Sequence, residues 1–162
     1  MKTVGVFVNT PLATIISVAG RLELDWVQLS GDEPAAFCRE LGLPVIKVIR
    51  VSKVYRPSEI LKHLEYSDRL LGDQEHIFLL DSNAREKYGG IGKKFDWKQA
   101  ATIAEKFPVI VAGGLTPQNV GHAIETLHPW GVDVSSGVEI TRGIKDVEKI
   151  RKFIETVRKY DA

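Results

Sequence analysis

The sequence predicts an α/β fold of alternating strands and helices that forms one domain over residues 1–162. Three observations favour this fold. Short apolar runs recur about every 25 residues, and each is followed by a longer segment with a helical pattern. The runs are rich in β-branched residues and apolar on both faces, which is typical of parallel strands covered by helices. The chain of 162 residues also has the length of a single domain.

Six runs are predicted strands, in this order: Val4–Val8, Trp26–Leu29, Val45–Val51, Ile77–Leu80, Val109–Ala112 and Val132–Val134. Capping residues and prolines predict where the helices begin: at Thr10-Pro11, at Asp32 or Glu33 before Pro34, at Pro57-Ser58, at Asp96 before Trp97, and at Thr116-Pro117. The last helix is predicted from Asp146 to Lys159, where apolar residues recur at helical spacing. Gly20, Gly42 and Gly72 are expected near helix ends.

Six parallel βα units permit either an open, doubly wound sheet or a barrel. An eight-stranded barrel needs at least about 200 residues, and this chain has 162. If the chain is of the barrel class, about two βα units are missing, and they should precede Met1. In that case the chain forms an incomplete (β/α) TIM-barrel of six βα units, and its open sheet edges would favour pairing into a homo-oligomer.

Composition excludes several kinds of partner and site. The formal net charge of +1 indicates neither a nucleic acid nor an anionic membrane as partner. The single cysteine, Cys38, excludes an internal disulfide framework and a cysteine-based zinc site, and it agrees with a reducing cytoplasm. No apolar run approaches the ~20 residues that span a bilayer. The four histidines lack metal-ligand spacing, so we expect no metal site.

Two glycine-rich turns predict a phosphate site. The turn after the fifth strand contains Gly113 and Gly114, and the turn after the sixth contains Ser135, Ser136 and Gly137. Each turn precedes a helix-like stretch, so several backbone N–H groups should lie side by side and attract an anion. The loops after the last two strands are a frequent phosphate site in barrel enzymes. The sequence therefore predicts a phosphorylated small molecule as ligand.

Two aspartates are candidates for acid–base chemistry. Asp81 ends the fourth strand, so its carboxyl group should stand at the edge of the sheet where ligands bind. There it is a candidate general acid, or alternatively a cap of the following turn. Asp133 alternates with Val132 and Val134 in the last strand, where it either touches the substrate or has a structural hydrogen-bonding role.

Other polar residues leave more than one interpretation open. Lys47, inside an apolar strand, points into the barrel or toward a carboxylate, or else marks an edge strand. Gln28 has similar geometry and is a ligand-binding candidate, with interior packing as the alternative for both residues. The glycine-rich segment Tyr88–Trp97 is not a Walker loop, and is either a lid or a flexible connection. Cys38 is expected to be a buried structural cysteine.

Taken together, the segments resemble the C-terminal three-quarters of the phosphoribosylanthranilate isomerase family, without its first two βα units. The resemblance implies a (β/α) barrel of the TIM-barrel type, here with six βα units. The resemblance rests on seven segments in order: Val4–Asn9, Val27–Gly31, Val45–Val48, Leu79–Ser82, Gly89–Trp97, Gly113–Val120 and Val132–Glu139. Each segment alone is a weak signal, whereas seven in order are highly specific.

The resemblance implies a cofactor-free isomerisation of N-(5-phosphoribosyl)anthranilate in tryptophan biosynthesis. A general acid opens the ribose ring, a general base removes a proton from the second sugar carbon, and the enolamine becomes a ketone. Asp81 matches the family's general acid, and Gln28 and Asp133 match further positions that line the site. The phosphate-binding turns of the family match these five residues: Gly113, Gly114, Ser135, Ser136 and Gly137. The helix that begins at Leu115 to Asn119 would direct its dipole at the phosphate.

The chain also departs from the family pattern. The family's base is a cysteine in a Lys-x-Cys-Gly motif, and an arginine binds the anthranilate carboxylate; neither segment is in this sequence. Ser30 stands where many relatives have histidine. We expect activity to be lower by about 10²–10⁴-fold without the base. The alternatives are a non-catalytic phosphate-binding fragment or partner subunit, and another barrel enzyme acting on a sugar phosphate.

Overall fold

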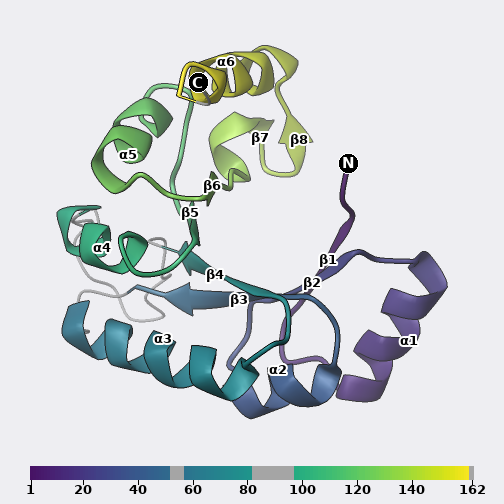
Figure 1. Ribbon diagram of the computed structural model, residues 1–162. Coiled ribbons are helices and arrows are strands. Elements are labelled where there is room, and N and C mark those ends of the chain that lie inside the picture. Colours follow the sequence, from purple (N-terminus) through teal and green to yellow (C-terminus); the bar gives the residue numbers. More distant parts are fainter. Residues whose placement is uncertain (52–56, 82–96, 161–162) are drawn as a thin grey trace, which may run out of the picture. The chain divides into compact units, whose positions relative to one another are not determined.

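The computed structural model describes residues 1–51, 57–81 and 97–160. The chain forms two compact units (Figure 1). The N-terminal unit comprises Met1–Ile49 and Ser58–Leu79, and the C-terminal unit comprises Arg50–Pro57 and Leu80–Ala162. The single domain expected over residues 1–162 stays a prediction.

The N-terminal unit contains the first four predicted strands. These are β1 (Val4–Phe7), β2 (Trp26–Leu29), β3 (Val45–Arg50) and β4 (His76–Asp81). The last residues of β3 and β4 belong to the C-terminal unit. β1 pairs in parallel with β2, and β2 pairs in parallel with β3. β4 lies next to β3, where the Val45 N–H donates to the Glu75 carbonyl at 3.0 Å. The predicted parallel arrangement is thus confirmed for β1, β2 and β3.

Three helices of this unit cover the strands from one side (Figure 1). They are α1 (Leu12–Leu22), α2 (Ala35–Leu41) and α3 (Pro57–Leu71). The core between helices and strands consists of Ile15, Ala19, Val27, Leu29, Cys38, Leu41, Val45 and Leu71. Full burial of one large aliphatic side chain contributes about 1.5–3 kcal/mol. Because the strand side chains that face the helices are buried, the strands consist mostly of apolar residues.

The helix boundaries differ from the predictions at three points in this unit. Pro11, not Thr10, is the N-cap of α1, and its carbonyl accepts from the N–H groups of Thr14 and Ile15. Pro34, not Asp32 or Glu33, is the N-cap of α2. Gly20 lies inside α1 and does not end it. Gly42 does end α2, with a φ of 65° that glycine adopts without steric cost.

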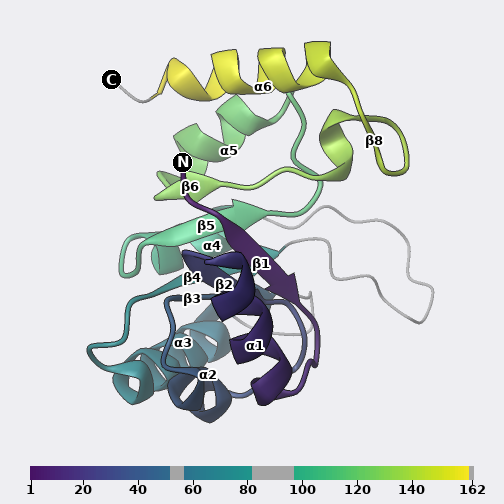
Figure 2. The same cartoon turned by 90° about the vertical axis from the view of Figure 1, so that its right-hand side faces the viewer.

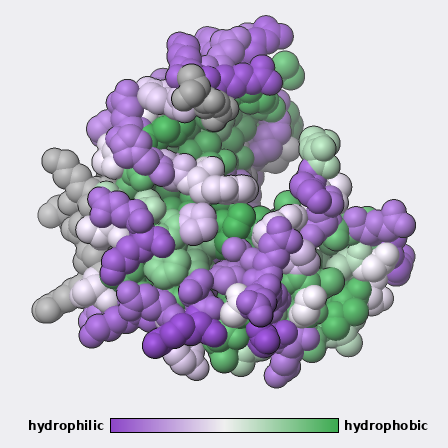
Figure 3. All heavy atoms as spheres, viewed as in Figure 1, coloured by the Kyte–Doolittle hydropathy of each residue, from purple (hydrophilic) through white to green (hydrophobic). Residues whose placement is uncertain are grey.

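The C-terminal unit contains the last two predicted strands and three helices. β5 (Val109–Ala112) pairs in parallel with β6 (Gly131–Val132). The helices are α4 (Trp97–Ala104), α5 (Val120–Leu127) and α6 (Val147–Arg158). α5 and α6 lie side by side (Figure 2), over a core of Leu115, Val120, Ala123, Val138 and Phe153. The outward surface at α6 is mostly hydrophilic, as its amphipathic pattern predicts (Figure 3).

Between β6 and α6 the chain forms structure that the sequence did not predict. A 3-10 turn, η1 (Ser136–Val138), leads into an antiparallel hairpin of β7 (Glu139–Thr141) and β8 (Ile144–Lys145). The second glycine-rich turn therefore has a hairpin between it and the next long helix. Strands of two and three residues are too short to show an alternating pattern. The last helix was predicted correctly to within one residue, and the Asp146 side chain caps it.

No helix among the residues that the structure describes is both long enough and apolar enough to cross a membrane.

A buried ion pair lies at the end of the strands in the N-terminal unit. Lys47 is 7% exposed and Glu33 is 6% exposed. The Lys47 Nζ lies 3.2 Å from the Glu33 Oε2, and it also donates to the Gly31 carbonyl at 3.2 Å. Of the interpretations open for Lys47, the structure thus confirms that it points toward a carboxylate.

The Glu33 carboxylate joins three segments of this unit. Its Oε1 accepts from the Asn9 N–H at 2.7 Å, and its Oε2 accepts from the Gly31 N–H at 3.0 Å. Asn9 follows β1 with a left-handed φ of 49°, and a side chain at Gly31 would collide with it. Burial alone would raise the pKa of Glu33. The hydrogen bonds from its own N–H, from Asn9 and from Lys47 outweigh burial, so the pKa lies below its ordinary value.

We expect Lys47→Met to lower the free energy of unfolding by about 3–5 kcal/mol, because it leaves the Glu33 carboxylate buried without its cation. Urea denaturation at pH 7 measures the change. The control is Lys2→Met, which breaks the exposed Lys2–Asp25 pair and should leave stability almost unchanged. Equal small effects of both substitutions would contradict the importance of the buried pair.

Candidate functional site

A pocket of about 140 Å³ lies in the C-terminal unit, where the predicted turns and aspartates come together. Asp81, residues 112–115 and residues 133–137 line it. It thus contains seven of the predicted site residues: Asp81, Gly113, Gly114, Asp133, Ser135, Ser136 and Gly137. The pocket is smaller than the ~300–1,000 Å³ that encloses a drug-sized ligand. It therefore suits one polar end of a ligand.

The turn after β5 depends on two glycines and one asparagine. Gly113 and Gly114 have φ angles of 91° and 70°, in the region that side chains disfavour. The Asn119 Oδ1 accepts from the Thr116 N–H at 2.7 Å, and its Nδ2 donates to the Gly114 carbonyl at 3.0 Å. This one amide side chain therefore closes the turn.

The predicted helix start at Thr116-Pro117 is wrong by a few residues. Residues 116–119 form a turn, and α5 begins at Val120. The asparagine side chain satisfies the Thr116 N–H locally, which favours a turn over a helix. Asparagine is common in turns for this reason, so the Thr-Pro-x-Asn spacing was the signal available for Asn119.

The turn after β6 packs directly against the turn after β5. A Cβ added at Gly137 would overlap the carbonyl of Leu115. Only glycine allows the two backbones to approach this closely. As a result, two turns that are distant in sequence form one continuous backbone wall of the pocket.

Asp133 lies just beyond β6 and not within it, which corrects the sequence prediction. β6 ends at Val132, although the Asp133 N–H still donates to the Val111 carbonyl at 2.9 Å. The residue keeps an exposed surface at the pocket. Burial of its carboxylate against the protein still raises its pKa, the negative charge of Asp81 adds to this, and the Lys145 ammonium opposes it.

The pocket therefore contains two carboxyl groups that interact electrostatically. Asp81 ends β4, and its carbonyl accepts from the Val51 N–H at 3.0 Å. The negative charge of Asp81 adds to burial in raising the pKa of Asp133. A carboxyl group with a raised pKa retains a proton to higher pH, which favours general acid catalysis at this pocket.

The remaining predicted residues lie elsewhere. Gln28 is on β2 in the N-terminal unit, where its Nε2 donates to the Ser30 Oγ at 3.1 Å, and its role at a site stays a prediction. The segment Tyr88–Trp97 falls almost entirely outside the described residues. Cys38 is fully buried, as predicted, and burial raises the pKa of its thiol.

Across residues 1–51, 57–81 and 97–160, histidine, cysteine and carboxylate side chains form no cluster that could hold a metal ion.

Comparison with known proteins identifies the family. Residues 1–156 match the model of the N-(5'-phosphoribosyl)anthranilate (PRA) isomerase family. The N-(5'-phosphoribosyl)anthranilate isomerase of Dehalococcoides mccartyi is 42% identical over 158 residues, which are 98% of this chain and 71% of that protein. The chain belongs to this family.

Solved structures agree with this assignment. The phosphoribosyl anthranilate isomerase of Thermotoga maritima superposes with a TM-score of 0.81 at 37% identity, over 98% of this chain and 74% of that one. A phosphoribosyl anthranilate isomerase in complex with reduced 1-(o-carboxyphenylamino)-1-deoxyribulose 5-phosphate matches with a TM-score of 0.78 at 34% identity, over 98% of this chain and 72% of that one. These similarities confirm the predicted TIM-barrel class and the predicted resemblance to this family.

We expect Gly137→Ala to disrupt the pocket, because the new methyl group overlaps the Leu115 carbonyl and separates the two turns. The free energy of unfolding should fall by about 1–3 kcal/mol, as for other overpacked sites. Affinity for inorganic phosphate, measured by titration calorimetry, should fall with it.

The control for this prediction is Gly20→Ala. A Cβ at Gly20 meets open space inside α1, so alanine should stabilise the protein by about 0.5–1 kcal/mol. If Gly137→Ala behaved like this control, the close contact between the turns would have no importance.

Proposed function

We infer that this chain, as a member of its family, converts N-(5-phosphoribosyl)anthranilate to 1-(2-carboxyphenylamino)-1-deoxyribulose 5-phosphate in tryptophan biosynthesis. One observation carries this inference: two glycine-rich turns and two carboxyl groups line the same pocket. The reaction moves hydrogen within one molecule, from an aminoaldose to an aminoketose. It therefore needs proton transfer and substrate positioning, and no external oxidant or reductant.

The turns after β5 and β6 are proposed to bind the phosphate end of the substrate. Backbone N–H groups offer partial positive charge without a cation. α5 follows the first turn, so its N-terminal dipole adds to the attraction for an anion. The residues proposed for this role are Gly113, Gly114, Ser135, Ser136 and Gly137, all of which line the pocket.

Asp81 is proposed as the general acid, with Asp133 beside it. Its proton passes to the ribose ring oxygen, the bond from that oxygen to the first sugar carbon breaks, and the nitrogen lone pair forms an iminium group. A base then removes the proton from the second carbon, and the resulting enolamine tautomerises to the ketone. Asp133 is a second carboxyl group in the same pocket, and burial and the Asp81 charge raise its pKa.

The base is the part of this mechanism that the sequence does not supply. The family resemblance assigns it to a cysteine in a Lys-x-Cys-Gly segment, and Cys38 is the one cysteine among the 162 residues. Cys38 is fully buried on α2, and burial raises the pKa of its thiol, so it is unsuited to proton abstraction. We propose that these 162 residues alone turn over substrate about 10²–10⁴-fold more slowly than a relative that has the base.

Loss of anthranilate fluorescence measures turnover directly. We expect the chain alone to be slow, and a mixture with a βα segment that contains the Lys-x-Cys-Gly motif to be faster. Asp81→Asn should lower the faster rate by about 10²–10⁴-fold, since it removes the proton donor.

The control substitution is Asp73→Asn, at an exposed position after α3, which should leave the rate unchanged. Equal rates for Asp81→Asn and the parent would overturn the role of Asp81. No turnover in any mixture, with phosphate binding intact, would favour a non-catalytic phosphate-binding subunit.

That second function is favoured by the exposed face of β1. β1 is the first strand in the order of the described sheet, and Val4, Val6 and Val8 are 41%, 62% and 59% exposed. Because alternate residues of a strand share a face, Val4 and Val6 form an apolar pair on β1, and Val8 follows directly after the strand. We propose that a second copy of the chain covers this face.

A cytoplasmic location is proposed on the weaker ground of one free cysteine.

Sedimentation velocity tests this pairing. The parent chain should sediment as a dimer or larger species, and Val6→Lys should give a monomer because a charge cannot be buried in an apolar contact. A parent chain that sediments as a stable monomer would contradict the proposal.

A further inference from the structure

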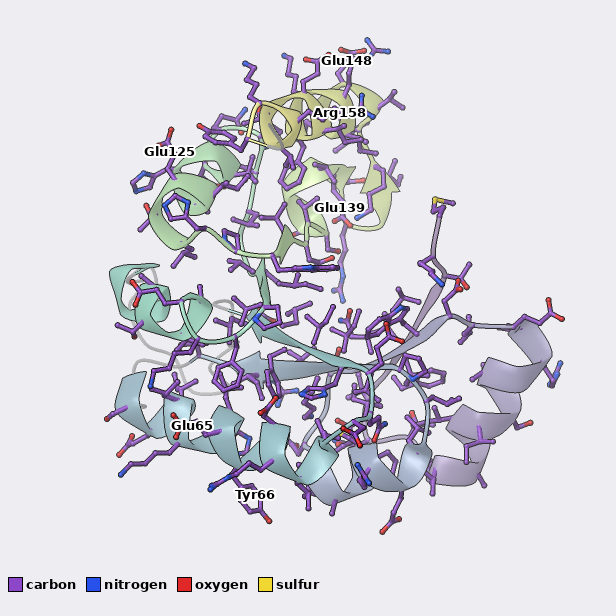
Figure 4. The ribbon with its side chains drawn as sticks, viewed as in Figure 1. Glu65, Tyr66, Glu125, Glu139, Glu148 and Arg158 are labelled. Carbon is purple, nitrogen blue, oxygen red and sulfur yellow. The ribbon has the colours of Figure 1, made fainter. Side chains whose placement is uncertain are left out.

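Lys145 connects the hairpin to the turn after β6. It lies on β8, and its Nζ donates to the Ser135 carbonyl at 2.8 Å and to the Glu139 Oε1 at 2.9 Å. Glu139, labelled in Figure 4, lies in the segment below α6 in that view. The Lys145 side chain is 44% exposed and that of Glu139 is 13% exposed. Two acceptors therefore hold a side chain that is otherwise long and flexible.

The bond to Ser135 determines the orientation of one peptide group. A trans peptide is planar, and its C=O and N–H point in opposite directions. The Ser135 carbonyl and the Ser136 N–H belong to the same peptide group, so fixing the oxygen toward Lys145 directs the N–H away from it. Ser135 has φ −118° and ψ −86°, outside both helix and strand geometry. Its carbonyl also accepts from the Val138 N–H of η1, but at 3.4 Å, so the 2.8 Å bond from Lys145 is the shorter of its two hydrogen bonds.

We propose that Lys145 is a positioning residue of the phosphate pocket, because it holds the Ser135 carbonyl on the hairpin side and directs the Ser136 N–H toward the bound phosphate. This inference rests on the proposed function, since it assigns a role within the same site. Ser135 and Ser136 both line the pocket. Lys145 does not line it, which makes its effect on the ligand indirect.

Lys145 also acts on Asp133. Among the described residues, the charged groups that act on Asp133 are Asp81, at the end of β4, and Lys145, on β8. The Lys145 ammonium lowers the pKa of Asp133, opposing burial and Asp81. One side chain thus links the orientation of the phosphate turn to the protonation of Asp133.

Titration with inorganic phosphate tests the positioning role. Lys145→Met should bind phosphate about tenfold more weakly than the parent, since the hydrogen bond from the charged donor to Ser135 is lost. The matched control is Lys149→Met. Lys149 donates to the Glu139 carbonyl at 2.6 Å, so this variant removes one positive charge and one hairpin contact while Ser135 keeps its partner. Its affinity should stay within twofold of the parent.

Two NMR measurements separate positioning from general loss of stability. Phosphate should shift the Ser136 amide resonance in the parent and in Lys149→Met, and shift it by less than half as much in Lys145→Met. The pH midpoint of the Asp133 carboxyl group should be higher in Lys145→Met than in the parent, because the opposing cation is gone. If Lys145→Met does not fold, Lys145→Gln should show the same reduced Ser136 shift and raised Asp133 midpoint.

The outcomes distinguish this inference from the function on which it rests. A parent chain that does not bind phosphate would overturn the proposed function and the role of Lys145 with it. A parent that binds phosphate, together with a Lys145 variant that matches it in affinity and in the Ser136 shift, would overturn the role of Lys145 alone.

Discussion

The N-terminal unit depends on the carboxylate of Glu33. Its oxygens accept from the Asn9 N–H, the Gly31 N–H and the Lys47 Nζ, so one group joins the segments after β1 and β2 to β3. Parallel strands have their ladder bonds along their length, but the loops at their ends leave backbone N–H groups without strand partners. A buried carboxylate satisfies two of these groups at once. The Lys47 ammonium offsets the cost of burying that charge.

In the described part of the C-terminal unit, the two turns at the pocket are held without a buried charged side chain. An amide side chain at Asn119 and direct backbone contact at Gly137 hold them instead. Asn119 accepts from the Thr116 N–H and donates to the Gly114 carbonyl, and Lys145 donates to the Ser135 carbonyl. A carboxylate that accepted from the N–H groups of these turns would compete with phosphate, whereas the charged side chain here, Lys145, binds a carbonyl.

Much of the site was predictable because its reactive residues and glycines follow directly after the apolar runs that form the strands. Asp81 ends an apolar run, and glycine pairs follow another, so the edge where ligands bind could be identified. The raised pKa of Asp133 was not predictable, since it depends on burial and on Asp81, some 50 residues away. Lys145 was missed for a related reason. Its partner Ser135 is ten residues away, across a hairpin too short to leave a pattern.

The sequence by itself determined the six strands, most helices, the glycine-rich turns and the family to which they belong, because each is encoded in residues adjacent along the chain. Tertiary structure decided the rest. It determined that Lys47 meets Glu33, that α5 begins only after the Asn119 turn, and that Gly137 is needed for close approach to Leu115. These depend on contacts between segments distant in sequence, and local residue patterns carry no information about which distant groups will satisfy a buried charge or fill a given space.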